Sequence, residues 1–221
     1  MAKELVDRSL PNDAEQADWR SAGLAGIVFA VAFMGFLAIV TSVPNLKGVD
    51  GPARVTRFYA SGGHRAMLVA GAYLAAVAAL AFIAFAEGLG RRLTALGGVG
   101  SAGLLSGASR LTASAIGTGG ACYGAIGSYL AFGLASQIDP QIGALIPSIG
   151  FFSVSVVAML SAATVVLTTC RGVSGSAPPR WLRAMAYLAV VGCVAGIAVV
   201  PILLFVAWVV ASSTWLIRSP R

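Results

Sequence analysis

The sequence predicts an all-α protein, a bundle of transmembrane helices that crosses a lipid bilayer about six times. Three observations favour this fold class. Only 10% of the 221 residues are charged and 58% are hydrophobic, whereas a soluble domain carries about 25% charged residues. Several uncharged apolar runs reach the ~20 residues that a helix needs to cross a bilayer. Basic residues gather at the ends of these runs, as they do beside membrane spans.

The first 20 residues are a predicted polar tail, and residues 21–218 form a single transmembrane domain. A secretory signal begins with a positive segment and has a shorter apolar core than the run from Ala22 to Val43. The tail is instead rich in acidic residues: Glu4, Asp7, Asp13, Glu15 and Asp18. We therefore expect residues 22–43 to stay in the membrane as the first span.

The polar segment after Pro44 predicts a short helix that lies on the membrane surface. Asp50 is placed to cap this helix, and Gly62-Gly63 to end it. An amphipathic helix of this kind separates apolar from basic side chains. The expected apolar face holds Val55, Phe58 and Tyr59, and the expected basic face holds Arg54 and Arg57.

Arg110 decides the position of the third span. A span over residues 98–121 would place this arginine near the middle of the bilayer, at a cost of about 2.5–3.5 kcal/mol. A span over residues 108–133 places it within a turn of the boundary, where its long side chain reaches the head groups. Residues 111–134 hold no charge, so we favour the second register.

The last apolar stretch, residues 182–217, is too long for one span. Its 36 residues would form a helix of about 54 Å against a core of ~30 Å. Pro201 divides the stretch, so two short helices in a hairpin fit better than one kinked helix. One kinked helix would give a five-span bundle, which is the alternative. The predicted spans are residues 22–43, 66–86, 108–133, 142–169, 182–199 and 201–217.

The distribution of basic residues predicts a cytoplasmic N-terminus and C-terminus. With six spans, eleven lysines and arginines lie in the inner segments and four in the outer segments, as the positive-inside rule requires. Trp19, Trp181 and Trp215 each lie within three residues of an arginine on that inner side, where an aromatic belt is expected. Five spans would move Arg218 and Arg221 outside and fit less well.

The polar residues nearest the predicted hydrocarbon core are the candidate functional residues. Glu87 and Arg110 lie at the inner ends of adjacent spans, so they either form an ion pair or each meet the head groups. Ionisable groups inside a membrane are functional candidates by default. Three tyrosines inside spans are candidates for an internal polar seam with Ser153 and Ser155: Tyr73, Tyr123 and Tyr129.

No set of residues in the sequence predicts catalysis, a cofactor or a metal site. An enzyme needs a nucleophile or base beside a partner, and no such pattern is present in the sequence. His64 is the single histidine and has no second ligand nearby, and the three cysteines lack a metal or redox spacing. Cys122 and Cys193 are expected inside helices and Cys170 at a helix end. The net charge of +7 is explained by membrane orientation rather than by nucleic acid.

The segment "PPRWLRAMAYLAVVGCVAGIAVVPILLFVAWVVASSTWLIRSPR" resembles the end of a family of bacterial, mainly actinobacterial, multi-pass membrane proteins without a known activity. The segment "VPNLKGVDGPARVTRFYASGGHRAMLVAGAYLAAVAAL" is similar to that family's first outer loop and second span. The resemblance implies a bundle of six spans in the bacterial plasma membrane. It implies no catalytic residue.

These observations favour a non-enzymatic membrane component that interacts with lipid or with a partner protein. The alternative is a small permease that works as an oligomer, and an intramembrane enzyme ranks third. Glycines four residues apart allow helix backbones to approach closely, and we expect them to pack within the bundle more often than in a homodimer. These pairs are Gly103 and Gly107, Gly120 and Gly124, and Gly192 and Gly196.

Overall fold

The computed structural model describes residues 13–95, 102–134, 138–171, 179–194 and 199–218, and within these ranges the chain is helical with connecting turns and no strand. The all-α prediction is therefore confirmed for the described residues. The helices are α1 (Asp13–Ser42), α2 (Gly51–Ala60), α3 (Gly62–Ala95), α4 (Ala102–Ala131), α5 (Pro140–Phe152), α6 (Met159–Arg171), α7 (Arg180–Val194) and α8 (Val199–Arg218).

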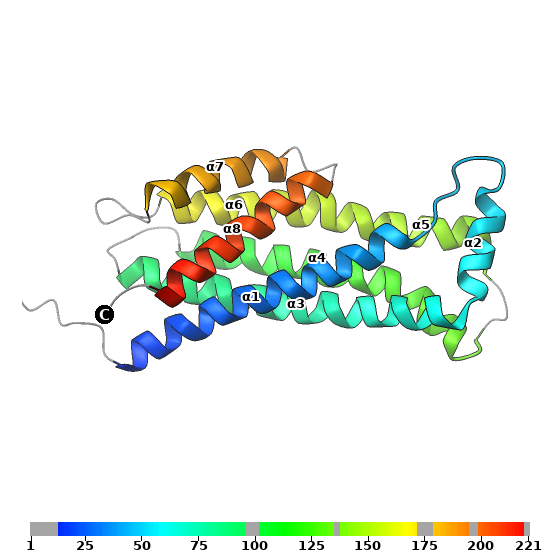
Figure 1. Cartoon of the computed structure of the whole chain (residues 1–221), viewed down its shortest axis with the longest axis horizontal. Coiled ribbons are helices and arrows are strands. Elements are labelled where there is room, and N and C mark those ends of the chain that lie inside the picture. The colour runs from blue at the N-terminus through cyan, green and yellow to red at the C-terminus, as the bar shows by residue number, and fades with distance from the viewer. Residues whose placement is uncertain (1–12, 96–101, 135–137, 172–178, 195–198, 219–221) are drawn as a thin grey trace, which may run out of the picture.

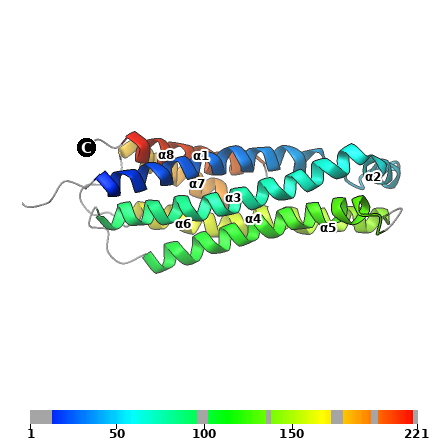
Figure 2. The same cartoon turned by 90° about the horizontal axis from the view of Figure 1, so that it is seen from below.

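The long helices run side by side along one axis, and α2 crosses one end of the bundle (Figures 1 and 2). A π-helical segment, Ser153–Ala158, joins α5 to α6 without a break, so the two form one rod. Helix α1 begins and α8 ends at the same end of the bundle (Figure 1), which we call the terminal end. We call the opposite end the α2 end.

Four rods cover the first four predicted spans, but the first begins earlier than expected. Helix α1 starts at Asp13, so residues 13–20 of the predicted tail belong to the helix. No proline or glycine interrupts residues 14–22, and an ion pair ties Asp18 to Arg91 near the end of α3. The helix therefore begins before the apolar run, and residues 13–20 are its polar first turns.

Helix α4 reaches Ala131 and so covers nearly all of the favoured third span. Arg110 lies eight residues after the first residue of this helix, about 12 Å along its axis. Its depth in a bilayer stays a prediction.

The last apolar stretch forms two helices, as predicted. Helices α7 and α8 pack against each other as an antiparallel hairpin (Figure 1). The first ends at Val194 and the second begins at Val199, two residues before Pro201. Proline is tolerated in the first turn of a helix because the N–H groups there have no partner in the helix.

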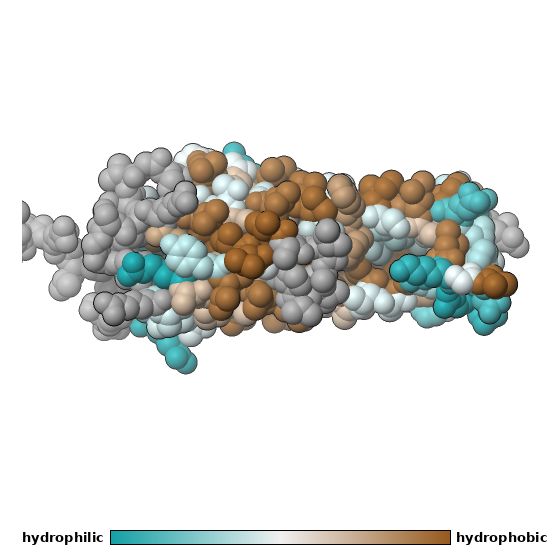
Figure 3. Space-filling model, turned by 90° about the horizontal axis from the view of Figure 1, so that it is seen from above, coloured by the Kyte–Doolittle hydropathy of each residue, from teal (hydrophilic) through white to brown (hydrophobic). Residues whose placement is uncertain are grey.

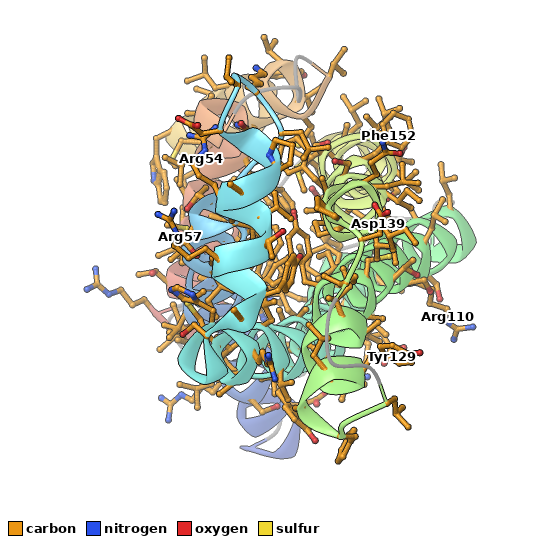
Figure 4. The ribbon with its side chains drawn as sticks, turned by 90° about the vertical axis from the view of Figure 1, so that its right-hand side faces the viewer. Arg54, Arg57, Arg110, Tyr129, Asp139 and Phe152 are labelled. Atoms are coloured by element: carbon orange, nitrogen blue, oxygen red, sulfur yellow. The ribbon has the colours of Figure 1, made fainter. Side chains whose placement is uncertain are left out.

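The short helix α2 is present, with the predicted faces but with different ends. Asp50 stands at its N-cap position, yet its side chain makes no capping hydrogen bond, and Gly62 begins α3 instead of ending α2. Val55, Phe58 and Tyr59 are buried, because α2 packs against α5 and α3. Arg54 and Arg57 point away from the bundle (Figure 4). The apolar face of α2 thus covers protein rather than lipid.

Three helical rods among the described residues are long and apolar enough to cross a membrane: Asp18–Ser42, Gly62–Ala95 and Pro140–Cys170. Large apolar side chains also cover much of the outside of the bundle, where hydrophobic residues dominate the face in Figure 3. Leu80 on α3 is 70% exposed and Val31 on α1 is also 70% exposed. A surface of this kind is typical of a protein surrounded by lipid.

Candidate functional site

A cleft lies between α1 and α5 at the α2 end of the bundle. Its volume is about 820 Å³, within the range of ~300–1,000 Å³ of small-molecule sites. Its apolar walls come from the end of α1, the segment after it, and α5. The lining includes Val40, Val43, Leu46, Leu145, Pro147 and Phe151, with five uncharged polar residues: Thr41, Asn45, Tyr123, Gln141 and Ser148.

The cleft exists because the α7–α8 hairpin covers only part of the bundle. Helix α8 packs against α1 and α7, and α7 packs against α6, so the hairpin fills the space between α1 and α6 toward the terminal end (Figure 1). The principal partners of α5 are instead α4 and α2. Toward the α2 end, α1 and α5 therefore face each other without a helix between them.

Pro147 frees a backbone carbonyl of α5 that accepts a hydrogen bond from α2 beside the cleft. Because proline has no backbone N–H, the helix leaves the carbonyl of Gly143, four residues earlier, without its usual donor. The Tyr59 hydroxyl of α2 donates to this carbonyl at 2.9 Å. Burial raises the pKa of Tyr59 to about 12, so this phenol stays protonated and remains a donor at neutral pH. The contact holds α2 against α5.

Arg65 attaches α2 to the neighbouring helices. Its guanidinium donates to the carbonyls of Tyr59 at 2.6 Å and Ala60 at 3.4 Å, at the end of α2, and to Leu130 at 3.4 Å, near the end of α4. Cationic side chains that bind the last carbonyls of a helix offset their negative dipole end. A single arginine thus stabilises two helix ends beside the cleft.

Tyr123 lies at the base of the cleft. Its side chain is 3% exposed, and its ring meets Phe36 of α1 edge to face at 5.8 Å between centroids. Its side chain lines the cleft, and its hydroxyl makes no hydrogen bond to another described residue. Gly119 and Gly150, on either side of the α4–α5 contact, bring the two backbones together next to this ring.

A second depression, of about 540 Å³, lies at the terminal end between the last turns of α3 and the first turns of α4. Its polar lining is Glu87, Arg91, Thr94, Ser106 and Ser109. Arg91 makes two contacts with the Asp18 carboxylate, Nε to Oδ2 at 2.9 Å and Nη2 to Oδ1 at 3.0 Å. Unlike the cleft, this depression contains charged groups.

Glu87 and Arg110 do not pair. Both side chains are exposed, and no ion pair joins them among the residues that the structure describes. Arg110 points away from the bundle (Figure 4). The sequence placed the two residues at the same end of neighbouring helices, but only Glu87 lines the depression between those helices.

The three tyrosines do not form one internal seam. Tyr73 is 71% exposed and Tyr129 is 49% exposed, whereas Tyr123 is buried. The helical period already predicts that Tyr123 and Tyr129 lie on different faces, because residues six positions apart lie about 120° apart around an α-helix. Only Tyr123 belongs to a candidate site.

Hydroxyl groups, rather than tyrosines, make the polar contacts between α4 and the α5–α6 rod. Ser153 donates to the carbonyl of Ala115 at 3.0 Å, and Thr112 donates to the Ser161 hydroxyl at 2.8 Å. Ser155 instead bonds the Phe151 carbonyl of its own rod at 2.7 Å. The sequence prediction named Ser153 as part of a polar seam but missed the contact between Thr112 and Ser161. Ser and Thr at apolar positions of these helices were the available signal.

The single histidine and the three cysteines do not form a binding site among the described residues. The His64 ring stacks on Phe58 with centroids 4.3 Å apart. All three cysteines are free, with Cys122 and Cys193 inside helices and Cys170 one residue before the end of α6, as predicted. No group of three or more metal-ligating side chains occurs among the described residues.

Arg92 is a polar residue that the sequence analysis did not single out. Its guanidinium lies 3.6 Å from the centroid of the Trp19 ring and 5.9 Å from that of Trp215. Trp19 is buried, so its ring packs inside the bundle. A cation over an indole ring is stabilised by the ring quadrupole.

No protein-family model, curated protein or solved structure matches this chain. The resemblance to bacterial multi-pass membrane proteins therefore stays a prediction. The geometry of the cleft is the evidence for function.

Proposed function

We propose that the protein is a six-span component of the bacterial plasma membrane that binds membrane lipid in the cleft between α1 and α5 and catalyses no reaction. The observation that carries this proposal is a largely apolar cleft on a bundle whose outer surface is itself apolar. Leu145 lines the cleft and is also 59% exposed at the surface of α5. The cleft is therefore open toward the side of the bundle, where acyl chains would lie.

The proposed topology places the terminal end in the cytoplasm. Helix α1 begins and α8 ends there (Figure 1), and it carries exposed arginines on several helices, including Arg20, Arg91 and Arg218. An excess of basic residues favours the cytoplasmic side. Helix α3 has 34 residues and extends about 51 Å, well beyond a ~30 Å core. Glu87 and Arg91 would then lie at or beyond the inner boundary.

Native mass spectrometry of the full chain in mild detergent tests the proposal. We expect the wild type to retain lipid and Ala144→Trp to lose it, because Ala144 lines the cleft and an indole there occupies the space. Ala125→Trp is the matched control, since Ala125 lies on the exposed face of α4. Retention of lipid by both variants would contradict binding in the cleft, and a stoichiometric protein partner without lipid would favour the partner-binding alternative.

A small permease is the second candidate function. It is favoured by the polar depression at the terminal end, on the same helix α4 whose other end reaches the cleft. Transfer of a fluorescent phospholipid between leaflets of proteoliposomes would test it. Movement that is lost in Glu87→Gln and kept in Arg110→Leu would favour a path through the depression, because Arg110 points away from the bundle.

A further inference from the structure

The Tyr123 hydroxyl belongs to a side chain that lines the cleft, and it makes no hydrogen bond to another described residue. It lies at the base of the cleft, on a side chain that is 3% exposed, and no described residue accepts its proton. Other hydroxyls near the cleft are already bonded: Tyr59 donates to Gly143, Ser148 to Ala144 and Thr41 to Ala38. The Tyr123 hydroxyl is therefore available to donate a hydrogen bond to an oxygen atom of a ligand in the cleft.

The polar lining of the cleft carries no charge. Its polar side chains are those of Thr41, Asn45, Tyr123, Gln141 and Ser148. Two charged residues at the α2 end bind backbone groups: Arg65 binds the carbonyls of Tyr59, Ala60 and Leu130, and Asp139 accepts from the backbone N–H of Gln141. The others are exposed and do not line the cleft: Lys47, Asp50, Arg54 and Arg57. A phosphate or ammonium group inside the cleft would have no counter-ion among the lining residues, and burying an unpaired charge is strongly unfavourable.

The depth of Tyr123 also favours an uncharged ligand. Tyr123 precedes the last residue of α4 by eight positions, about 12 Å along the helix axis. A group that reaches it must leave the level at which charged head groups meet water. An uncharged head bearing hydroxyl or ester oxygens reaches this depth at a much lower desolvation cost than a phosphate.

We infer that the cleft binds a neutral glycerolipid of the diacylglycerol type, whose uncharged head accepts a hydrogen bond from Tyr123 while its chains contact Val40, Leu145 and Phe151. The inference rests on the proposed lipid-binding function and names the class of lipid. The lipid enters from the leaflet at the α2 end, through the side of the cleft at which Leu145 is exposed.

Titration of the delipidated full chain with two lipids, followed by native mass spectrometry, tests the inference. Dioleoylglycerol and dioleoylphosphatidic acid share the same chains and glycerol and differ only in the phosphate. We expect dioleoylglycerol to bind at least about tenfold more tightly. Tyr123→Phe keeps the ring against Phe36 and removes the donor, so it should weaken dioleoylglycerol binding about two- to tenfold, the worth of one hydrogen bond.

Tyr129→Phe is the matched control, because Tyr129 lies on the same helix but is 49% exposed and does not line the cleft. It should bind dioleoylglycerol as the wild type does. Equal or tighter binding of dioleoylphosphatidic acid would overturn the neutral class while leaving lipid binding intact. Unchanged affinity in Tyr123→Phe, with loss in Ala144→Trp, would overturn the role of the hydroxyl. Failure of every lipid to bind would instead reject the proposed function.

Discussion

Two regions of the bundle are held together in different ways. Where α1, α3 and α8 meet, large aromatic rings interlock: Phe205 lies 5.9 Å from Phe29, 5.7 Å from Phe82 and 6.3 Å from Trp208, between ring centroids. Glycines also allow close approach in this region, at Gly26 and Gly88. Toward the α2 end, glycines bring the backbones of α3 and α4 together. A Cβ atom on Gly120 would lie 2.3 Å from the Cβ of Ala75, and one on Gly124 would lie 2.5 Å from that of Ala72.

The difference shows how the cleft is formed. Bulky rings fill the space where three helices converge, and they leave little room for a ligand. At the α2 end the hairpin no longer covers α1, and α3 and α4 are joined through small residues that need no bulky neighbour. Without a strong hydrophobic drive between helices in lipid, such close backbone contacts supply much of the association. The tightly packed ring cluster and the open cleft thus lie at different positions along the same bundle.

The largest expected effect comes from the ring cluster. Phe205→Ala should lower the free energy of unfolding by about 3–5 kcal/mol, because Phe205 is fully buried and the cavity cannot collapse among rigid rings. Thermal unfolding in mild detergent measures the change. Phe151→Ala at the cleft is the comparison, and it should cost much less because that ring is only partly buried and faces open space. Equal losses would contradict the separation of the two regions.

A smaller effect is expected from the glycine contacts. Gly120→Ala should destabilise the protein by about 1–3 kcal/mol, since the added methyl group forces α3 and α4 apart. Gly107→Ala, on the same helix, meets nothing within 4 Å. It should be neutral or stabilising by up to about 1 kcal/mol, because alanine favours a helix more than glycine does. If both variants lose the same stability, the close contact at Gly120 is not the cause of the loss, because Gly107 makes no such contact.

The bond between α2 and α5 predicts a more local effect. Tyr59→Phe removes the donor to the Gly143 carbonyl and should cost about 1–3 kcal/mol, because the buried carbonyl beside Pro147 is left unsatisfied. Tyr187→Phe, on an exposed tyrosine of α7, serves as the control. Hydrogen exchange should rise in α2 before it rises in α1 or α3. Faster exchange throughout the bundle would show that this bond supports the whole fold.

Most helices were predictable because a bilayer imposes a length on apolar segments. The run 142–169 became the α5–α6 rod, and Asp139 caps its start by accepting a hydrogen bond from the Gln141 N–H. The break in the last apolar stretch followed from its excess length and from Pro201. These features depend on local chemistry and on the thickness of a membrane, and neither requires knowledge of the packing.

The site was not predictable, because it depends on how helices rotate and on where one hairpin lies. Tyr73, Tyr123 and Tyr129 all sit in helices rich in alanine and glycine, and only packing decides which is buried. The cleft depends on how far α8 reaches along α1, which no local pattern encodes. Arg92 was overlooked for the same reason, since its two tryptophan partners come from α1 and α8.

The smallest predicted effect concerns the charges at the terminal end. Asp18→Asn breaks the pair with Arg91, but the side chains are 43% and 55% exposed, and a surface pair of this kind contributes about 0–1 kcal/mol. Glu87→Gln and Arg110→Gln should leave the melting temperature unchanged, because neither residue has an ion-pair partner within the described part of the chain. A different result would reveal a Glu87–Arg110 pair in the membrane: each single variant would lose stability, and the double variant would lose no more than either single variant. Since Arg110 points away from the bundle while Glu87 lines the depression, we expect the effects of the two changes on stability to be additive and close to zero.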